Sequence, residues 1–190
     1  MKIGITGGIG TGKSYVCALL AQRGIEVYDC DIAAKRLMNC SAGLRQQIAE
    51  LVGTDAYQPD GKLNKAVVAQ FLLASAHNAA ALDAIVHPAV IDDFLNSGKQ
   101  WMESAILFEA GIDRIMDKVV CVTAPEAVRI ERVVRRDGIS PEKARQWIQH
   151  QWPQEKKAAM ADFEIVNDGQ AALLPQIDRF LASLRMTSKD

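Results

Sequence analysis

Residues 7–14, with the sequence Gly-Gly-Ile-Gly-Thr-Gly-Lys-Ser, constrain the fold of this chain more than any other segment. They match the pattern Gly-x-x-x-x-Gly-Lys-Ser, whose glycines let backbone N–H groups turn toward phosphate oxygens. The apolar run at residues 2–6 predicts a buried strand, and the amphipathic run at residues 15–23 predicts a helix closed by Gly24. A strand, a glycine-rich loop and a helix in this order predict a phosphate-binding loop at a helix N-terminus.

The loop pattern assigns a role to each kind of residue in it. We expect contacts to the phosphates of a nucleoside triphosphate from Gly8, Ile9, Gly10, Thr11, Gly12, Lys13, Ser14 and Tyr15. Lys13 is expected to reach the β- and γ-phosphates, and the Ser14 hydroxyl is expected to ligate Mg²⁺. The alternative is a glycine-rich turn that happens to match the pattern, and the flanking strand and helix argue against it.

Composition narrows the class of protein. The 190 residues are 49% hydrophobic and 24% charged, enough for one substantial core and a small appended unit. Cys17, Cys30, Cys40 and Cys121 show no Cys-x-x-Cys spacing, which favours free thiols over disulfides or a zinc site. The net charge of −1 predicts neither a nucleic-acid nor a membrane partner. Without a long apolar run or a signal peptide, the sequence predicts a cytoplasmic protein.

Strand-like runs alternate with helical segments, which predicts an α/β fold with a parallel sheet. After the first strand, further strands are expected at residues 25–29, 102–108, 118–122 and 163–166. The stretch between the second and third strands, residues 32–100, is much longer than a crossover helix requires. We expect it to be a helical substrate domain whose pieces are separated by Gly43, Gly53, the turn at 57–61 and Pro88. Residues 186–190 are expected to fray.

Residues 129–157 are locally basic. A capping box at 123–126 predicts a helix that ends near Arg136, and Ser140 with Pro141 predicts the start of another helix. Arg132 and Arg136 are four residues apart, so they can face one anion as part of a lid that closes over phosphates. The alternative is a pair of solvated helices with intrahelical ion pairs.

Two carboxylates, Asp29 and Asp31, follow the second predicted strand, where ligands bind in open α/β sheets. Beside a phosphate loop, such a carboxylate can accept the proton of an attacking hydroxyl. The alternative is structural, since Asp31 could cap a helix that begins at Ile32.

The loop followed by Asp29-Cys30-Asp31 resembles the dephospho-coenzyme A kinase family, and the resemblance extends over nearly the whole chain. Further matching elements are Ile85-Val86-His87-Pro88, Ala105-Ile106-Leu107-Phe108-Glu109, Arg132, Arg136-Asp137, Lys157, Ala161-Asp162 and Asn167-Asp168-Gly169. Three positions depart from the family pattern, because Thr11, Tyr15 and Ala105 stand where Ser, Thr and Pro are common.

The resemblance implies a three-layer α/β/α P-loop fold with a five-stranded parallel sheet. It divides the chain into a nucleotide-binding core at residues 1–31, 101–134 and 162–190, a dephospho-coenzyme A-binding insertion at 32–100, and a lid at 135–161. It also implies that the γ-phosphoryl group of ATP is transferred to the ribose 3′-hydroxyl of dephospho-coenzyme A, with Mg²⁺ as cofactor. A monomer or a weak homo-oligomer is expected.

The same resemblance implies roles for single residues. Asp31 would be the base and Lys13 a charge stabiliser, and Asp29 would lie with Asp31 at the acceptor. His87 and Glu109 would line the acceptor site. The lid cations would be Arg132 and Arg136, and the residues near adenine would be Asn167 and Gly169.

Two other classes stay open from the residues alone. Another small-molecule P-loop kinase would share the loop and the lid but bind a different acceptor. A nucleotide switch would change conformation without transferring phosphate, although the sequence has no Asn-Lys-x-Asp motif for guanine.

Overall fold

The structure is a computed structural model that describes residues 1–187. The chain forms two compact units, one of Met1–Tyr28 with Lys99–Asp190 and the other of Asp29–Gly98. Each unit is described by itself below.

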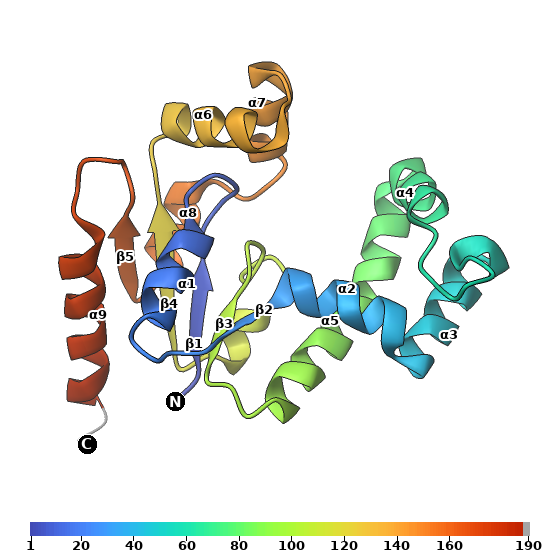
Figure 1. Cartoon of the computed structure of the whole chain (residues 1–190), viewed down its shortest axis with the longest axis horizontal. Coiled ribbons are helices and arrows are strands. Elements are labelled where there is room, and N and C mark those ends of the chain that lie inside the picture. Colours follow the sequence, from blue (N-terminus) through green and yellow to red (C-terminus); the bar gives the residue numbers. More distant parts are fainter. Residues whose placement is uncertain (188–190) are drawn as a thin grey trace. The chain divides into compact units, whose positions relative to one another are not determined.

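The larger unit contains a five-stranded sheet with the order β2-β3-β1-β4-β5 (Figure 1). The strands are β1 Ile3–Thr6, β2 Val27–Asp29, β3 Trp101–Glu103, β4 Lys118–Thr123 and β5 Phe163–Val166. β1 pairs in parallel with β3 and with β4, and β4 pairs in parallel with β5. The predicted five-stranded parallel sheet is confirmed.

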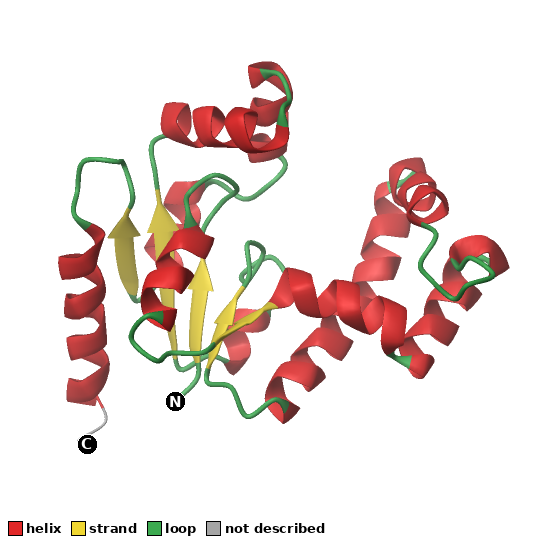
Figure 2. Cartoon of the chain, viewed as in Figure 1, coloured by secondary structure: helices red, strands yellow, loops and turns green. Residues whose placement is uncertain are grey.

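Helices cover both faces of this sheet (Figures 1 and 2). The helices of the larger unit are α1 Lys13–Ala21, α6 Glu126–Asp137, α7 Pro141–Gln149, α8 Gln154–Met160 and α9 Leu173–Thr187. On one face, α1 and α9 bury a shared apolar cluster with the strands. On the other face, α8 packs against β4. The predicted three-layer α/β/α fold is therefore confirmed.

The main core lies between the sheet and the helices α1 and α9. Ile3 and Ile5 alternate along β1 toward this layer, and both are almost fully buried. Phe180 of α9 is 1% exposed and meets the Trp101 ring edge-on, with 5.9 Å between the ring centroids. Burying side chains of this size contributes about 1.5–3 kcal/mol each, which fixes α1 and the loop before it on the sheet.

The smaller unit is helical, as the sequence predicts for residues 32–100. Its elements are α2 Cys30–Cys40, α3 Ala42–Val52, the short helix η1 Thr54–Ala56, α4 Lys65–Ala74 and α5 Ala76–Asn96. Buried residues from α3, α4 and α5, such as Ile48, Val68 and Phe94, form its interior.

Two predicted breaks in the smaller unit are wrong. Pro88 lies inside α5 rather than at its end. The buried side chains of Val86, Val90 and Phe94 on the same helix outweigh the hydrogen bond that proline removes. Gly43 lies in the first turn of α3, because Ser41 caps that helix by accepting a hydrogen bond from the Leu44 N–H.

Two predictions in the larger unit are also corrected. The strand expected at 102–108 ends at Glu103 as β3, and Leu107 and Phe108 are buried in the turn that follows. The capping box at 123–126 does not form, because Thr123 is the last residue of β4 and α6 begins only at Glu126, after Pro125 at its N-cap. The next predicted helix start is confirmed, since the Ser140 hydroxyl accepts from the Lys143 N–H.

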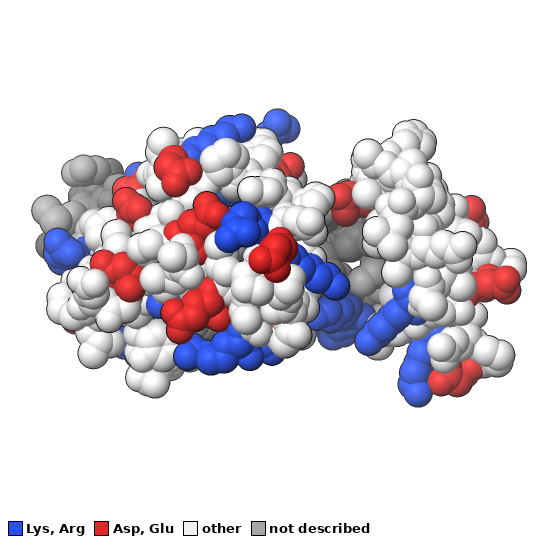
Figure 3. Space-filling view, turned by 90° about the horizontal axis from the view of Figure 1, so that it is seen from above, with Lys and Arg blue, Asp and Glu red and all other residues white. Residues whose placement is uncertain are grey.

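Acidic and basic side chains are interspersed on the face of the larger unit that Figure 3 shows. None of the helices within residues 1–187 is long and apolar enough to span a membrane. The fraying expected at residues 186–190 is wrong for Met186 and Thr187, which belong to α9, and the rest of that prediction, residues 188–190, lies outside the described part of the chain.

Candidate phosphate-binding site

The glycine-rich loop connects β1 to α1, as predicted, but α1 begins at Lys13 rather than at residue 15. Lys13 is 9% exposed. Its Nζ lies 3.4 Å from the Gly8 carbonyl oxygen and 3.7 Å from Glu103 Oε1. Ser14 and Tyr15 follow in the first turn and are exposed. The loop therefore contains a buried ammonium group, that of Lys13, and an exposed hydroxyl group, that of Ser14.

Four successive carbonyl oxygens of the loop, those of residues 8–11, accept hydrogen bonds from side chains. The contacts are Thr11 Oγ1 to Gly8 O at 2.9 Å, Arg129 Nε to Ile9 O at 2.9 Å, Arg132 Nη1 to Gly10 O at 3.4 Å and Asn167 Nδ2 to Thr11 O at 2.8 Å. These donors fix the direction in which each carbonyl points.

The amides of the loop are placed differently. Within the described residues, the N–H groups of Gly10, Gly12 and Ser14 have no hydrogen-bond partner. Unpaired N–H groups at the start of a helix form an anion site, to which the helix dipole adds partial positive charge. The loop can therefore bind phosphate through its amides while its carbonyls are held by side chains.

Arg132 and Asn167 come together at the loop. Arg132 Nη2 donates to Asn167 Oδ1 at 3.3 Å, and Arg132 Nη1 also lies 3.3 Å from the Thr11 carbonyl oxygen. Both residues were expected to contact ATP, and here they bind the loop itself. Gly169, expected near adenine, is exposed in the turn that follows β5.

Arg136, the second predicted lid cation, is placed differently from Arg132. Its guanidinium binds the adjacent Asp137 carboxylate with two hydrogen bonds of 2.9 and 2.8 Å, and its side chain is 60% exposed. These side-chain hydrogen bonds raise the pKa of Arg136 and lower the pKa of Asp137. The structure brings Arg132 to the phosphate loop and leaves Arg136 on the surface of α6.

Three residues at the loop were missed by the sequence analysis. They are Glu103 beside Lys13, Arg129 beside Ile9, and Gln151, whose Oε1 accepts from the Ile9 N–H at 2.7 Å. The signal for Glu103 was its place at the carboxyl end of a strand next to β1. Arg129 and Gln151 carried no sequence signal beyond the basic character of their segment.

Glu109 forms a buried ion pair. Its Oε1 lies 2.6 Å from Lys157 Nζ, and Lys157 is 0% exposed. Lys157 also donates to the Ala105 carbonyl at 2.7 Å, and the Trp152 N–H donates to Glu109 Oε1 at 3.3 Å. Glu109 Oε2 is buried and has no hydrogen-bond partner within the described residues. The pair ties α8 to the turn after β3.

The predicted acceptor residues Asp29, Asp31 and His87 belong to the smaller unit. Asp29 is the N-cap of α2, because its Oδ1 accepts from the Ile32 N–H at 2.8 Å. The alternative in which Asp31 caps this helix is therefore wrong, and Asp31 is exposed in the first turn of that helix. Asp31 is thus free of the capping role. His87 Nε2 lies 3.5 Å from Asp83 Oδ1 along α5.

The oxygen donors near Lys13 fit a hard cation. Ser14 contributes a hydroxyl and Glu103 a carboxylate, the ligand types that Mg²⁺ prefers, and Mg²⁺ is usually held by few protein groups together with substrate phosphates. Within the described residues, no three His, Cys, Asp or Glu side chains gather at one point.

Cys121 on β4 is not placed for nucleophilic chemistry. Burial, reinforced by Glu164, raises the pKa of its thiol to about 12. The thiol is therefore protonated at neutral pH and unreactive.

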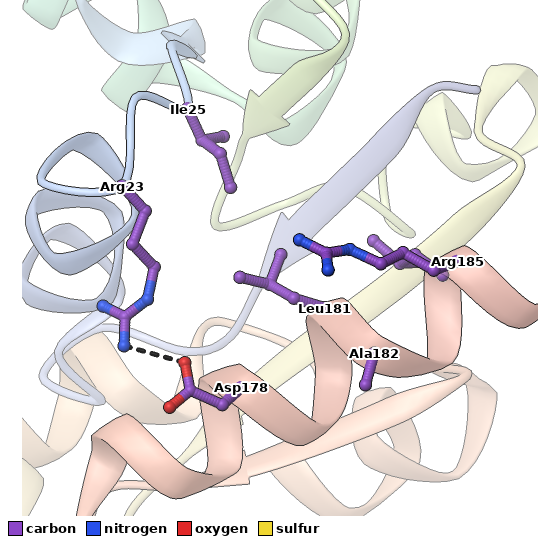
Figure 4. Close-up of a pocket in the computed structure, with 7 residues that line it drawn as sticks. Arg23, Ile25, Asp178, Leu181, Ala182 and Arg185 are labelled. Atoms are coloured by element: carbon purple, nitrogen blue, oxygen red, sulfur yellow. Dashed lines mark hydrogen bonds and ion pairs between the residues drawn. The ribbon is translucent and has the colours of Figure 1, made fainter.

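A cavity of about 590 Å³ lies at the other end of α1, lined by Arg23 and by Asp178 and Arg185 of α9 (Figure 4). Arg23 Nη2 is bound to Asp178 Oδ1 at 2.8 Å, as the dashed line in Figure 4 shows. The phosphate loop precedes the first turn of α1, whereas this cavity adjoins its last turn, so the two are separate sites.

Comparisons with known proteins agree with the predicted resemblance. The family model for dephospho-CoA kinase matches residues 1–172. A dephospho-CoA kinase from Bacteroides fragilis (strain YCH46) is 41% identical over 97% of this chain and 93% of that protein. One from Chlorobaculum tepidum is 39% identical over 97% of this chain and 95% of that protein. The solved structure of TT1252 from Thermus thermophilus has a TM-score of 0.81 and 28% identity over 100% of this chain and 98% of that one.

Proposed function

The chain belongs to the dephospho-CoA kinase family, and from this premise we propose how its residues catalyse the ATP-dependent phosphorylation of dephospho-CoA to coenzyme A. The proposal assigns the nucleotide to the larger unit and the acceptor to the unit Asp29–Gly98. The observation that carries it is the phosphate loop, whose carbonyls are bound by side chains while the amides of Gly10, Gly12 and Ser14 are available.

ATP binds along residues 8–15, with its phosphates against the amides of Gly10, Gly12 and Ser14. Lys13 supplies a positive charge from inside the loop, which stabilises the charge on the transferring phosphoryl group. Arg132, which already contacts the loop, adds a second cation beside it. Asn167 and Gly169 lie toward the adenine, and residues 135–161 act as a lid that excludes water during transfer.

Mg²⁺ would be held by the Ser14 hydroxyl, with Glu103 as the nearby carboxylate. When bound, the ion neutralises charge on the β- and γ-phosphates. Glu103 is the last residue of β3, next to β1, a position from which a carboxylate can serve the same site as the loop.

Asp31 is the general base. It accepts the proton of the ribose 3′-hydroxyl of dephospho-CoA while that oxygen attacks the γ-phosphorus, the bond from this phosphorus to the bridging oxygen breaks, and ADP leaves. Its position supports the role, because it is an exposed carboxylate that does not cap α2. Asp29 holds the start of α2 and so orients Asp31.

His87 and Glu109 are proposed to line the acceptor site. Glu109 already binds Lys157 and the Trp152 N–H through Oε1, so a contact with the acceptor would be made by Oε2. We further propose a cytoplasmic enzyme, monomeric or weakly homo-oligomeric, whose partners are its two substrates.

A panel of acceptors tests this function. The protein is incubated with ATP, Mg²⁺ and dephospho-CoA, AMP, CMP or shikimate, and the products are weighed by mass spectrometry. We expect the mass of one phosphate to be added to dephospho-CoA alone, and a 3′-specific phosphatase to remove it. Phosphorylation of another member of the panel instead would contradict the assignment.

A further inference from the structure

Ile9 lies in the middle of the phosphate loop, and side chains form hydrogen bonds with both its backbone C=O and its backbone N–H. Arg129 Nε donates to the Ile9 carbonyl at 2.9 Å, and Gln151 Oε1 accepts from the Ile9 N–H at 2.7 Å. Arg129 belongs to α6, whereas Gln151 lies in the connection between α7 and α8. One loop residue is therefore bound by two segments more than 110 residues away in the chain.

Arg129 also occupies the space on both sides of Ile9. A Cβ atom on Gly8 would lie 2.3 Å from Arg129 Nη2, and one on Gly10 would lie 2.6 Å from the Arg129 carbonyl oxygen. Gly10 has in addition a φ of +80°, which disfavours any side chain. The loop pattern leaves both positions open to any residue. In this chain the Arg129 backbone requires glycine at residue 10, and a side chain at residue 8 would have to displace the Arg129 guanidinium.

The Arg129 guanidinium is well fixed. The residue is 5% exposed, and burial lowers its pKa while the nearby Glu126 and Glu155 act in the opposite direction. A guanidinium stays charged in proteins, so its buried N–H groups need acceptors. The Ile9 carbonyl is one of these acceptors, which makes the contact costly to break.

The bond from Ile9 to Gln151 does not compete with phosphate for the free amides. The N–H groups of Gly10, Gly12 and Ser14, which lack partners within the described residues, lie further along the loop. Arg129 and Gln151 thus fix the conformation of the Ile9 backbone, and the three amides that are available to an anion stay unused.

From this geometry we propose that Arg129 and Gln151 are positioning residues, which hold Ile9 so that the loop is already in its ATP-binding conformation. They touch neither substrate nor reacting atoms, and they act through the loop. The inference rests on the proposed function only in taking ATP as the nucleotide. It links the affinity for ATP to the packing of α6 and of the connection between α7 and α8.

Gln151→Met tests the inference, because methionine keeps the length and removes the acceptor. The matched control is Gln22→Met, since Gln22 is exposed at the end of α1, outside the phosphate loop and the proposed lid. ATP affinity is measured by calorimetry without dephospho-CoA, and kcat and KM are measured with it. We expect Gln151→Met to weaken ATP binding about tenfold and to raise the KM for ATP equally, with kcat at saturating ATP within about twofold of the parent.

Arg129→Met and the double variant complete the test. Because both side chains act through one residue, the double variant should weaken ATP binding far less than the product of the two single effects. The inference is overturned if Gln151→Met binds ATP as tightly as Gln22→Met, even with a lower melting temperature. It is also overturned if kcat falls while ATP affinity is unchanged, or if the two effects multiply. Calorimetry needs no acceptor, so a failure to phosphorylate dephospho-CoA would be distinguishable from any of these results.

Discussion

Lys13 Nζ lies 3.7 Å from Glu103 Oε1, and the two side chains are only 10% and 11% exposed. Lys13 is the first residue of α1 and Glu103 is the last residue of β3, so the pair joins the phosphate loop to a neighbouring strand. A charge held this way is in place before nucleotide arrives, which lowers the cost of reorganisation during transfer.

Lys13→Ala should remove nearly all phosphoryl transfer while leaving a folded protein, since Lys13 contributes charge at the phosphates. It should also lower the melting temperature, because Glu103 loses a buried partner. Adding Glu103→Gln should recover part of the melting temperature and none of the activity. Circular dichroism melts and a coupled ADP assay give both quantities, and turnover close to that of the parent in Lys13→Ala would refute the role of Lys13.

Asp31→Asn should lower the rate of transfer by about 10²–10⁴ with ATP affinity nearly unchanged, because the amide keeps the shape of the carboxylate but cannot take a proton. Asp29→Asn is the matched control, since asparagine also caps helices well and should preserve α2. The single-turnover rates of the two variants show which of the two carboxylates is the base. A loss of transfer in Asp29→Asn with only a few-fold change in Asp31→Asn would show that the wrong carboxylate was chosen.

Arg132→Lys and Arg136→Lys should separate two roles. Arg132 binds Gly10, Thr11 and Asn167 without ATP, so its replacement should weaken ATP binding as well as slow transfer. Arg136→Lys should lower the transfer rate more than it weakens ATP binding, because lysine cannot grip two phosphate oxygens when the lid closes. Unchanged single-turnover rates in both variants would mean that neither arginine takes part in phosphoryl transfer.

Lys157→Met should destabilise the protein strongly, by about 3–5 kcal/mol, because it leaves the Glu109 carboxylate buried without its cation. The double variant Glu109→Gln with Lys157→Met should recover much of that loss, since no buried charge remains. Urea unfolding measures the free energies of unfolding of Lys157→Met, of Glu109→Gln and of the double variant. A double variant as unstable as the sum of the single variants would mean that the two side chains do not act as a pair.

The fold was largely predictable because its strongest signals are local. The phosphate loop, the β5 strand and the Ser140 cap each depend on a few adjacent residues, and each is found where the sequence predicts it. Errors arose where tertiary contacts decide. An apolar run such as Ile106-Leu107-Phe108 suits a buried strand or a buried turn equally well, and periodicity cannot separate them.

The loop's surroundings were less predictable for the same reason. Glu103 was missed because the strand was predicted to run from 102 to 108, which put Glu109 instead of Glu103 at its carboxyl end. Arg129 looked like one of several cations on an amphipathic helix, and only the fold shows it buried against Ile9. Gln151 has no local pattern at all. The roles of Asp31, His87 and Arg136 in catalysis and binding stay predictions.

Acceptor-dependent release of ADP tests the central claim most directly. The protein is mixed with ATP and Mg²⁺, and ADP is followed with and without dephospho-CoA. We predict slow release without acceptor, rapid release on addition of dephospho-CoA, and one coenzyme A formed for each ADP. Release that is equally fast without dephospho-CoA, or that yields no coenzyme A, would contradict the account.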